Sequence, residues 1–203
     1  MIDEGYIKFE SHWRKTGCLE DDAIASLNRW RRPLFDAGLI GYDHEHDVGY
    51  GNLSVRADLN GSFIISGSQT GNLPELGAEH YALVERCDIE NNRVYSSGAC
   101  EASSESLTHA AIYGLDAQIG AVVHVHCGAA WSALRGTAAT TDAAVSFGTP
   151  AMAREFVRLW NETDFANSGI AVMAGHESGL VSFGADLEQA AMRMLSACQT
   201  TGR

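Results

Sequence analysis

The sequence lacks several features that mark particular classes of protein. Its five cysteines are scattered and form no CxxC pair, which excludes a disulfide framework or a structural zinc knuckle. No apolar stretch reaches the ~18 residues that a membrane-spanning helix needs, and the polar amino terminus shows no secretory signal. We therefore expect a cytoplasmic protein, in a reducing compartment and without a membrane partner.

Basic charge is also scarce. Lys and Arg together number 14 against 26 Asp and Glu, which gives a formal net charge of −12. Such a surface repels the phosphate backbone of nucleic acid over most of its area, so nucleic acid is not expected as a partner. An anionic substrate would have to be held by a local device, such as backbone amides, hydroxyls or a metal.

The chain of 203 residues has three prolines and contains no internal repeat, low-complexity tract or Pro/Gly-rich linker. At roughly 100–200 residues per domain, this length favours one compact unit. The apolar fraction of 45% and the charged fraction of 20% are ordinary for globular proteins. We predict a single domain over residues 1–203.

Hydrophobic spacing and turn residues predict interleaved helices and strands. The strongest hairpin signal is Asn60-Gly61, between two short apolar runs, which excludes a purely parallel sheet. Helices are expected over 21–38, 78–86, 103–115, 150–160 and 186–198, and further strands over 93–96, 119–126, 170–174 and 179–183. The pattern is that of an α/β protein.

The sharpest chemical feature is the pair His124 and His126, which alternate with Val123 and Val125 at the end of a β-rich run. A period of two places both imidazoles on one strand face, close enough to share a metal ion. The alternative is two histidines on a half-wet sheet face. The buried run before the pair favours metal ligands.

A catalytic zinc site takes three protein ligands and keeps one open position. His176, in the glycine-flanked loop GHESG, is the best candidate for the third ligand, with a solvated turn residue as the alternative. His44 and His46 form a rival pair with the same spacing. They lie in the acidic stretch YDHEHDVGYG, which favours a solvated loop.

Glu105 follows two serines at a predicted helix start. A helix amino terminus can hold an anion with its free N–H groups, whereas a carboxylate beside a polarised carbonyl can remove a proton from the adjacent carbon. The alternative role for Glu105 is simple helix capping.

Six segments together resemble the motifs of the class II aldolase/adducin family, in the family's order. They are GNLSVR at 51–56, the Ser/Thr/Gly loop at 65–71, SSESLTH at 103–109, AVVHVH at 121–126, FGTPAMA at 147–153 and the His176 loop. The resemblance covers about residues 22–198. It implies a three-layer α/β/α domain with a mostly antiparallel central sheet, assembled as a homotetramer with active sites at subunit interfaces.

The resemblance also implies roles for individual residues. His124, His126 and His176 would bind Zn²⁺ or a similar divalent metal, and Glu105 would act as the catalytic base. The family's phosphate-binding positions fall on Asn52, Thr70, Gly71, Ser103 and Ser104. The tyrosine that the aldolase uses as proton donor has no counterpart, because the segment 127–146 contains no tyrosine.

These observations predict a zinc-dependent lyase of aldolase or dehydratase type. Its substrate would be a small sugar-like carbonyl compound, free or phosphorylated, which reacts through an enediolate. Two alternatives remain open: an epimerase of the same family, and a noncatalytic assembly module like the adducin heads. We expect a homo-oligomer in either case.

Overall fold

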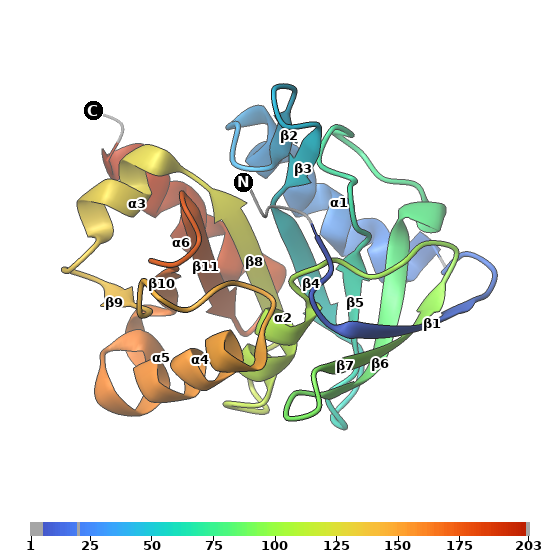
Figure 1. Cartoon of the computed structure of the whole chain (residues 1–203). Helices are drawn as coiled ribbons and strands as arrows, with labels where there is room; N and C mark the ends of the chain where they lie inside the picture. The colour runs from blue at the N-terminus through green and yellow to red at the C-terminus, as the bar shows by residue number, and fades with distance from the viewer. Residues whose placement is uncertain (1–5, 20, 202–203) are drawn as a thin grey trace.

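The computed structural model describes residues 6–19 and 21–201, with the backbone alone for 21–23 (Figure 1). The helices are α1 (Asp21–Asp36), α2 (Ser106–Tyr113), α3 (Gly128–Leu134), α4 (Pro150–Glu162), α5 (Phe165–Ser168), α6 (Leu187–Thr201) and the short 3₁₀ helix η1 (Ala78–His80). The strands are β1 (Glu10–Lys15), β2 (Gly41–Asp43), β3 (Val48–Tyr50), β4 (Asn52–Arg56), β5 (Phe63–Ser66), β6 (Tyr81–Asp88), β7 (Arg93–Gly98), β8 (Ala121–His126), β9 (Ala139–Thr140), β10 (Ile170–Val172) and β11 (Gly179–Gly184).

A nine-stranded sheet forms the centre of the fold, in the order β1-β7-β6-β5-β4-β8-β11-β10-β9. The inner pairs are antiparallel, whereas the outermost pair at each edge, β1 with β7 and β9 with β10, is parallel. The predicted mostly antiparallel sheet is therefore corrected to a mixed sheet. Parallel neighbours need long connections, and α4 with α5 supplies one between β9 and β10.

The hairpin predicted at Asn60-Gly61 is confirmed: it joins β4 to β5, and Gly61 takes the left-handed conformation with φ of 94°. A second hairpin, β2–β3, forms a separate two-stranded sheet. Its turn carries His44 and His46, both exposed, which agrees with the expected solvated loop.

The helix predicted over 78–86 is wrong beyond its first turn. Only Ala78–His80 is helical, and the chain then continues as β6, paired with β5 and β7. Ala82 and Val84 are buried in that sheet while Leu83, between them, is half-buried. Pairing with two neighbouring strands therefore outweighs the helix preference of Ala, Glu and Leu in this segment.

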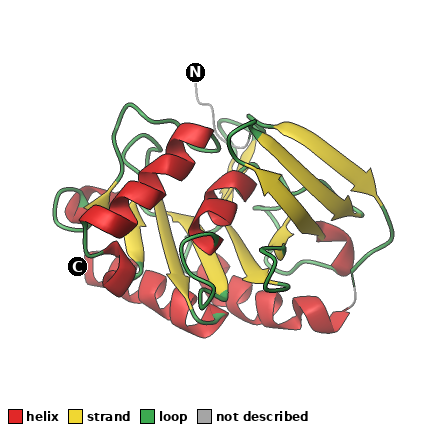
Figure 2. Cartoon of the chain, turned by 90° about the horizontal axis from the view of Figure 1, so that it is seen from below, coloured by secondary structure: helices red, strands yellow, loops and turns green. Residues whose placement is uncertain are grey.

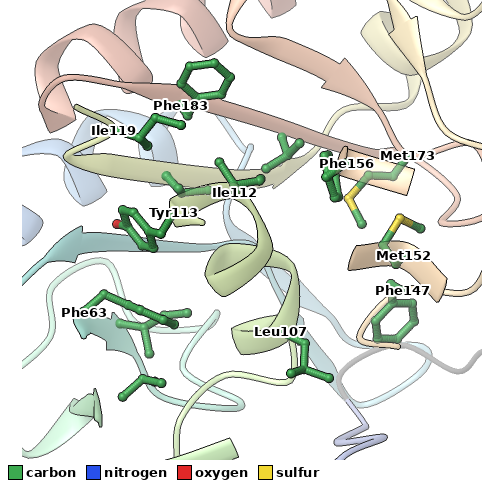
Figure 3. Packing of buried hydrophobic residues seen from close by; sticks show 14 of the residues in the cluster. Phe63, Leu107, Ile112, Tyr113, Ile119, Phe147, Met152, Phe156, Met173 and Phe183 are labelled. Atoms are coloured by element: carbon green, nitrogen blue, oxygen red, sulfur yellow. The ribbon is translucent and has the colours of Figure 1, made fainter. Parts of the chain in front are cut away.

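Helices cover both faces of the sheet, so the fold has three layers (Figure 2). One apolar core lies between the sheet and α2, α4 and α5; Phe63, Ile112, Phe156 and Phe183 belong to it (Figure 3). A second apolar core lies between the opposite face of the sheet and the helices α1, α3 and α6. It includes Leu27, Val123, Val125, Leu180 and Met194. In the described part of the chain no helix is long and apolar enough to cross a membrane.

Two caps fix the helices that follow the site segments. The Thr149 hydroxyl accepts a hydrogen bond from the Met152 N–H, with Pro150 in the first turn of α4, as predicted. The Asp186 carboxylate accepts one from the Gln189 N–H at the start of α6. All five cysteines are free thiols.

Candidate active site

Strand β8 lies in the middle of the sheet, between β4 and β11, and ends in the two predicted histidines. His124 pairs with Asn52 on one side and Val181 on the other, while His126 pairs with Gly179. Their side chains share one sheet face because strand residues two apart point the same way. His124 is fully buried and His126 is half-buried, so both imidazoles are held inside the protein at the strand end.

His176 meets this pair from the loop between β10 and β11. Its Nε2 atom lies 3.0 Å from Nε2 of His126 and 3.3 Å from Nε2 of His124. The flanking glycines allow the approach: a Cβ on Gly179 would overlap the His176 ring, and one on Gly175 would overlap the backbone carbonyl of Val145. The structure thus brings all three predicted ligands together.

Hydrogen bonding and burial prepare the histidines as neutral ligands. His124 donates from Nδ1 to the Leu180 carbonyl oxygen at 3.0 Å, which leaves the Nε2 lone pair facing the other two rings. Burial lowers the pKa of His124 to about 4, against the opposing effect of the Leu180 carbonyl. Burial also lowers the pKa values of His126 and His176 well below their usual range, helped by the neighbouring histidines.

The spacing of the three histidines fits a single metal ion. Nitrogens about 2.05 Å from a tetrahedral zinc ion lie about 3.3 Å from one another, close to the two separations observed here. The described residues contain one group of at least three such ligands, and it is this one. A fourth position would remain for a carboxylate, water or substrate.

Glu105 stands beside the histidines. Its Oε1 atom lies 3.9 Å from Nε2 of His176, and both of its carboxylate oxygens are buried without a hydrogen-bond partner among the described residues. The residue precedes α2, yet its side chain makes no capping hydrogen bond, so the simple capping role does not hold. Burial raises the pKa of Glu105 to about 7, with the nearby Thr108 hydroxyl and the charge of Lys8 acting in the opposite direction.

A small pocket, partly open to solvent, lies next to Glu105. Three segments of the chain line it and supply hydroxyls, two side-chain amides and glycine backbone but no Lys or Arg. The lining residues are Gly49, Gly51, Asn52, Gly67, Ser68, Gln69, Thr70, Gly71, Ser103, Ser104 and Glu105. All five residues at the expected phosphate-binding positions therefore lie around one space, which also contains the carboxylate.

The β2–β3 hairpin connects this pocket, here named the anion pocket, with the histidines. The Gly49 N–H donates to the Gln69 side chain at 2.9 Å, and Gly71 packs so closely against the hairpin that an added Cβ would overlap the Gly41 carbonyl. On the other side of the hairpin, the Tyr50 ring centroid lies 5.2 Å from that of His126. One small element thus touches both halves of the site.

Several residues next to the site were not predicted from the sequence. Lys8 places its ammonium 3.5 Å above the centre of the Phe147 ring, whose centroid lies 4.3 Å from that of His176. Apart from its neighbouring glycines, nothing in the sequence around Tyr50 indicated that it lies near the site. Arg31 lies behind the anion pocket, and its position between Leu27 and Leu34 on the apolar face of the predicted helix was the one available clue.

Other histidines lie away from the centre. His109, on α2, is fully buried and pairs through Nδ1 with the Ser54 hydroxyl at 2.7 Å. His46 pairs with Asp43 in the exposed hairpin turn, and His12 stacks on Tyr95 at the sheet edge. The contacts of His46 and His12 explain their positions, whereas Nε2 of His109 is buried without a hydrogen-bond partner among the described residues.

Comparison with known proteins decides the family. The family described as "Class II Aldolase and Adducin N-terminal domain" matches residues 34–200, which is most of the chain. The chain belongs to the class II aldolase and adducin family. A comparison with curated proteins found no significant match.

Solved structures of this class II aldolase family share the fold. L-fuculose-1-phosphate aldolase from Thermus thermophilus superposes with a TM-score of 0.65 at 20% identity, covering 90% of this chain and 92% of that one. Sugar-phosphate aldolase from Thermotoga maritima gives 0.68 at 15%, with 89% and 92% covered. The aldolase II superfamily protein from Pseudomonas syringae gives 0.59 at 17%, with 88% and 72% covered. At these identities the likeness establishes the fold.

Proposed function

We propose that this protein is a divalent-metal-dependent lyase of aldolase or dehydratase type, acting on a small sugar-like carbonyl compound that carries an anionic group such as phosphate. The observation that carries the proposal is the position of Glu105. Its carboxylate is buried and unpartnered among the described residues, 3.9 Å from the histidine centre and on the wall of the anion pocket. A group that costs stability in this way fits a catalytic role better than a structural one.

The residues divide the work as follows. His124, His126 and His176 would hold Zn²⁺ or a similar ion, which when bound supplies the Lewis acidity that polarises a carbonyl. Glu105 removes the proton from the carbon next to that carbonyl and returns it, since a pKa near the working pH suits both directions. The anionic end is held by Asn52, Thr70, Gly71, Ser103 and Ser104.

The alternatives predict different measurements. A noncatalytic adducin-head-like module does not need three histidine nitrogens at ligand spacing or an unpartnered buried carboxylate, so the site favours an enzyme. An epimerase would use the same base and metal, and product analysis separates it from a lyase.

The test combines elemental analysis of the purified protein with a panel of phosphorylated and free keto-sugars. We expect one divalent ion per chain and turnover of at least one phosphorylated compound, lost in Glu105→Gln. A protein without bound metal that turns over nothing in the panel, with zinc supplied, would overturn the proposal in favour of the noncatalytic module.

A homo-oligomer, a tetramer in the first instance, completes the proposal. It rests on the family resemblance, in which active sites lie at subunit interfaces. Light scattering of the purified protein tests it, and a monomer at micromolar concentration that retains activity would contradict it.

A further inference from the structure

The guanidinium of Arg31 lies directly behind the loop that lines the anion pocket. Its Nη2 donates to the carbonyl oxygens of Thr70 at 2.7 Å and Leu73 at 2.8 Å, and its Nε donates to Leu73 at 3.0 Å. One turn earlier on α1, Asn28 bonds to both the carbonyl and the N–H of Leu76. Helix α1 therefore holds the loop at several backbone points, and Thr70 both accepts a hydrogen bond from the guanidinium and lines the pocket.

Arg31 is also the one buried cation among the described residues, with a fully covered side chain. Its hydrogen bonds go to neutral carbonyls, and its Nη1 atom is buried without a hydrogen-bond partner among the described residues. Burial lowers the pKa of Arg31 to about 10, which leaves the group charged at neutral pH. Burying a charge without an opposite charge is costly, so such a group normally has an anionic partner.

The anion pocket, which Thr70 lines, lacks a positively charged side chain. Its lining offers hydroxyls, the side-chain amides of Asn52 and Gln69, and backbone. The one charged residue in it is Glu105, which is negative when ionised. A bound anion would there meet no cation directly, in a chain of net charge −12. The guanidinium of Arg31, behind Thr70, is the nearest buried positive charge. In low-dielectric surroundings its attraction for an anion in the pocket is screened less than it would be in water.

We propose that Arg31 is a positioning residue for anion binding. It holds the Thr70–Leu73 turn in the shape that lines the anion pocket and supplies, from behind that turn, the positive charge that the pocket wall lacks. Arginine suits this role because its planar fork can bond to two carbonyls at once, whereas lysine keeps the charge without the geometry. The inference rests on the anion pocket of the proposed function.

The experiment measures inorganic phosphate binding by calorimetry, with the protein as purified and its metal content determined in the same samples. Arg31→Met removes charge and hydrogen bonds, Arg31→Gln removes the charge but keeps a carbonyl-binding amide, and Arg31→Lys keeps the charge. We expect phosphate affinity to fall about 10–100-fold in Arg31→Met, which is the size of effect of one partly screened charge. Arg31→Gln should fall nearly as far, and Arg31→Lys should recover part of the loss.

Arg32→Met is the matched control. Arg32 is the next residue on α1, but it is exposed and pairs with Asp36 and Glu75 at the surface, so its removal should leave phosphate affinity unchanged. Metal content should stay constant in all variants. A purely structural role predicts instead that phosphate affinity, metal content and thermal midpoint fall together and that lysine rescues nothing.

The outcomes separate this inference from the proposed function. Suppose that the original protein binds phosphate and that a folded Arg31→Met or Arg31→Gln variant has a phosphate affinity within about twofold of the original. The proposed role of Arg31 is then wrong, whereas the anion pocket is retained. If Arg31→Met fails to fold, Arg31→Gln decides by the same criterion, and Arg31→Lys is expected to bind phosphate more tightly than Arg31→Gln. If the original protein binds no phosphate, the anion pocket itself is wrong, and the inference falls with it.

Discussion

Nε2 of His176 lies 3.9 Å from Oε1 of Glu105, and the two side chains are each 3% exposed. This separation is too long for a hydrogen bond, but one ion or one substrate atom between the two groups would contact both. The carboxylate belongs at the same time to the wall of the anion pocket. Glu105 therefore borders both the anion pocket and the histidine centre.

The histidine centre should bind one divalent ion per chain. His124→Ala or His126→Ala should abolish stoichiometric metal in elemental analysis, since each removes one of three converging nitrogens. His44→Ala and His46→Ala, in the exposed turn of the β2–β3 hairpin, serve as controls and should retain it. Full metal content in the His124 or His126 variants would mean that the ion is bound elsewhere.

Glu105→Gln should abolish most turnover and leave metal binding and folding intact. The amide keeps the shape of the side chain but cannot accept a proton, and loss of a general base typically costs ~10²–10⁴ in rate. The measurement is kcat on the substrate that the panel identifies, together with circular dichroism. Unchanged kcat would show that the carboxylate takes no part in proton transfer.

The same carboxylate should make metal-free protein less stable as the pH rises. Its pKa is about 7 in the folded protein against 4.5 in an ordinary glutamate, so stability is full below pH 4.5 and is lost as the pH rises towards 7. Denaturant unfolding of Glu105→Gln and the original protein at pH 4.5 and pH 8 isolates this effect. The variant should gain about 3 kcal/mol relative to the original protein between the two pH values. A constant difference would show that the pKa is ordinary.

Gly71→Ala should damage the anion pocket. A Cβ at this position would overlap the Gly41 carbonyl and lie 2.8 Å from both Gly49 Cα and Tyr50 N, all backbone atoms that cannot turn aside. We expect a loss of phosphate affinity of at least about tenfold and a lower thermal midpoint by several degrees, since such overpacking costs about 1–3 kcal/mol. Gly17→Ala is the control, because an added Cβ there would meet nothing within 4 Å. Equal phosphate affinity in Gly71→Ala would place the anion elsewhere.

Fuculose phosphate should be cleaved slowly or not at all. The segment 127–146 contains no tyrosine to protonate a leaving alkoxide, and the hydroxyl of Tyr50, the phenol beside His126, lies against Gly41 in its own hairpin. Dehydration or epimerisation needs only one group that moves a proton both ways. Cleavage of fuculose phosphate at about 1–10³ per second, ordinary for enzymes, would show that another donor has taken over.

The sequence was most informative where chemistry and local pattern coincide. His124 and His126 could be placed on one face because a strand period of two fixes side-chain direction, and Asn60-Gly61 specified its own turn. The 78–86 segment shows the opposite case, because β6 forms by pairing with strands from two other parts of the chain. Local propensity carries no information about such partners.

The parallel edges of the sheet and the contacts of Arg31 could not be predicted from the sequence for a similar reason. β1 pairs with β7 across about eighty residues of sequence, and nothing in either segment specifies the other. Arg31 reads in sequence as one of three basic residues on an amphipathic helix. Its burial follows from the turn at Thr70–Leu73 folding against α1, which only the tertiary structure provides.

The β2–β3 hairpin gives the site a thermodynamic property that neither half has alone. Gly49 and Gly41 contact Gln69 and Gly71 in the wall of the anion pocket, while Tyr50 contacts His126. A shift of the hairpin that favours one ligand therefore also changes the site of the other. Metal and phosphate should then be linked ligands: each changes the affinity of the other, and by the same factor. Phosphate titrations with and without metal should give dissociation constants whose ratio differs from one, and metal titrations with and without phosphate should give the same ratio.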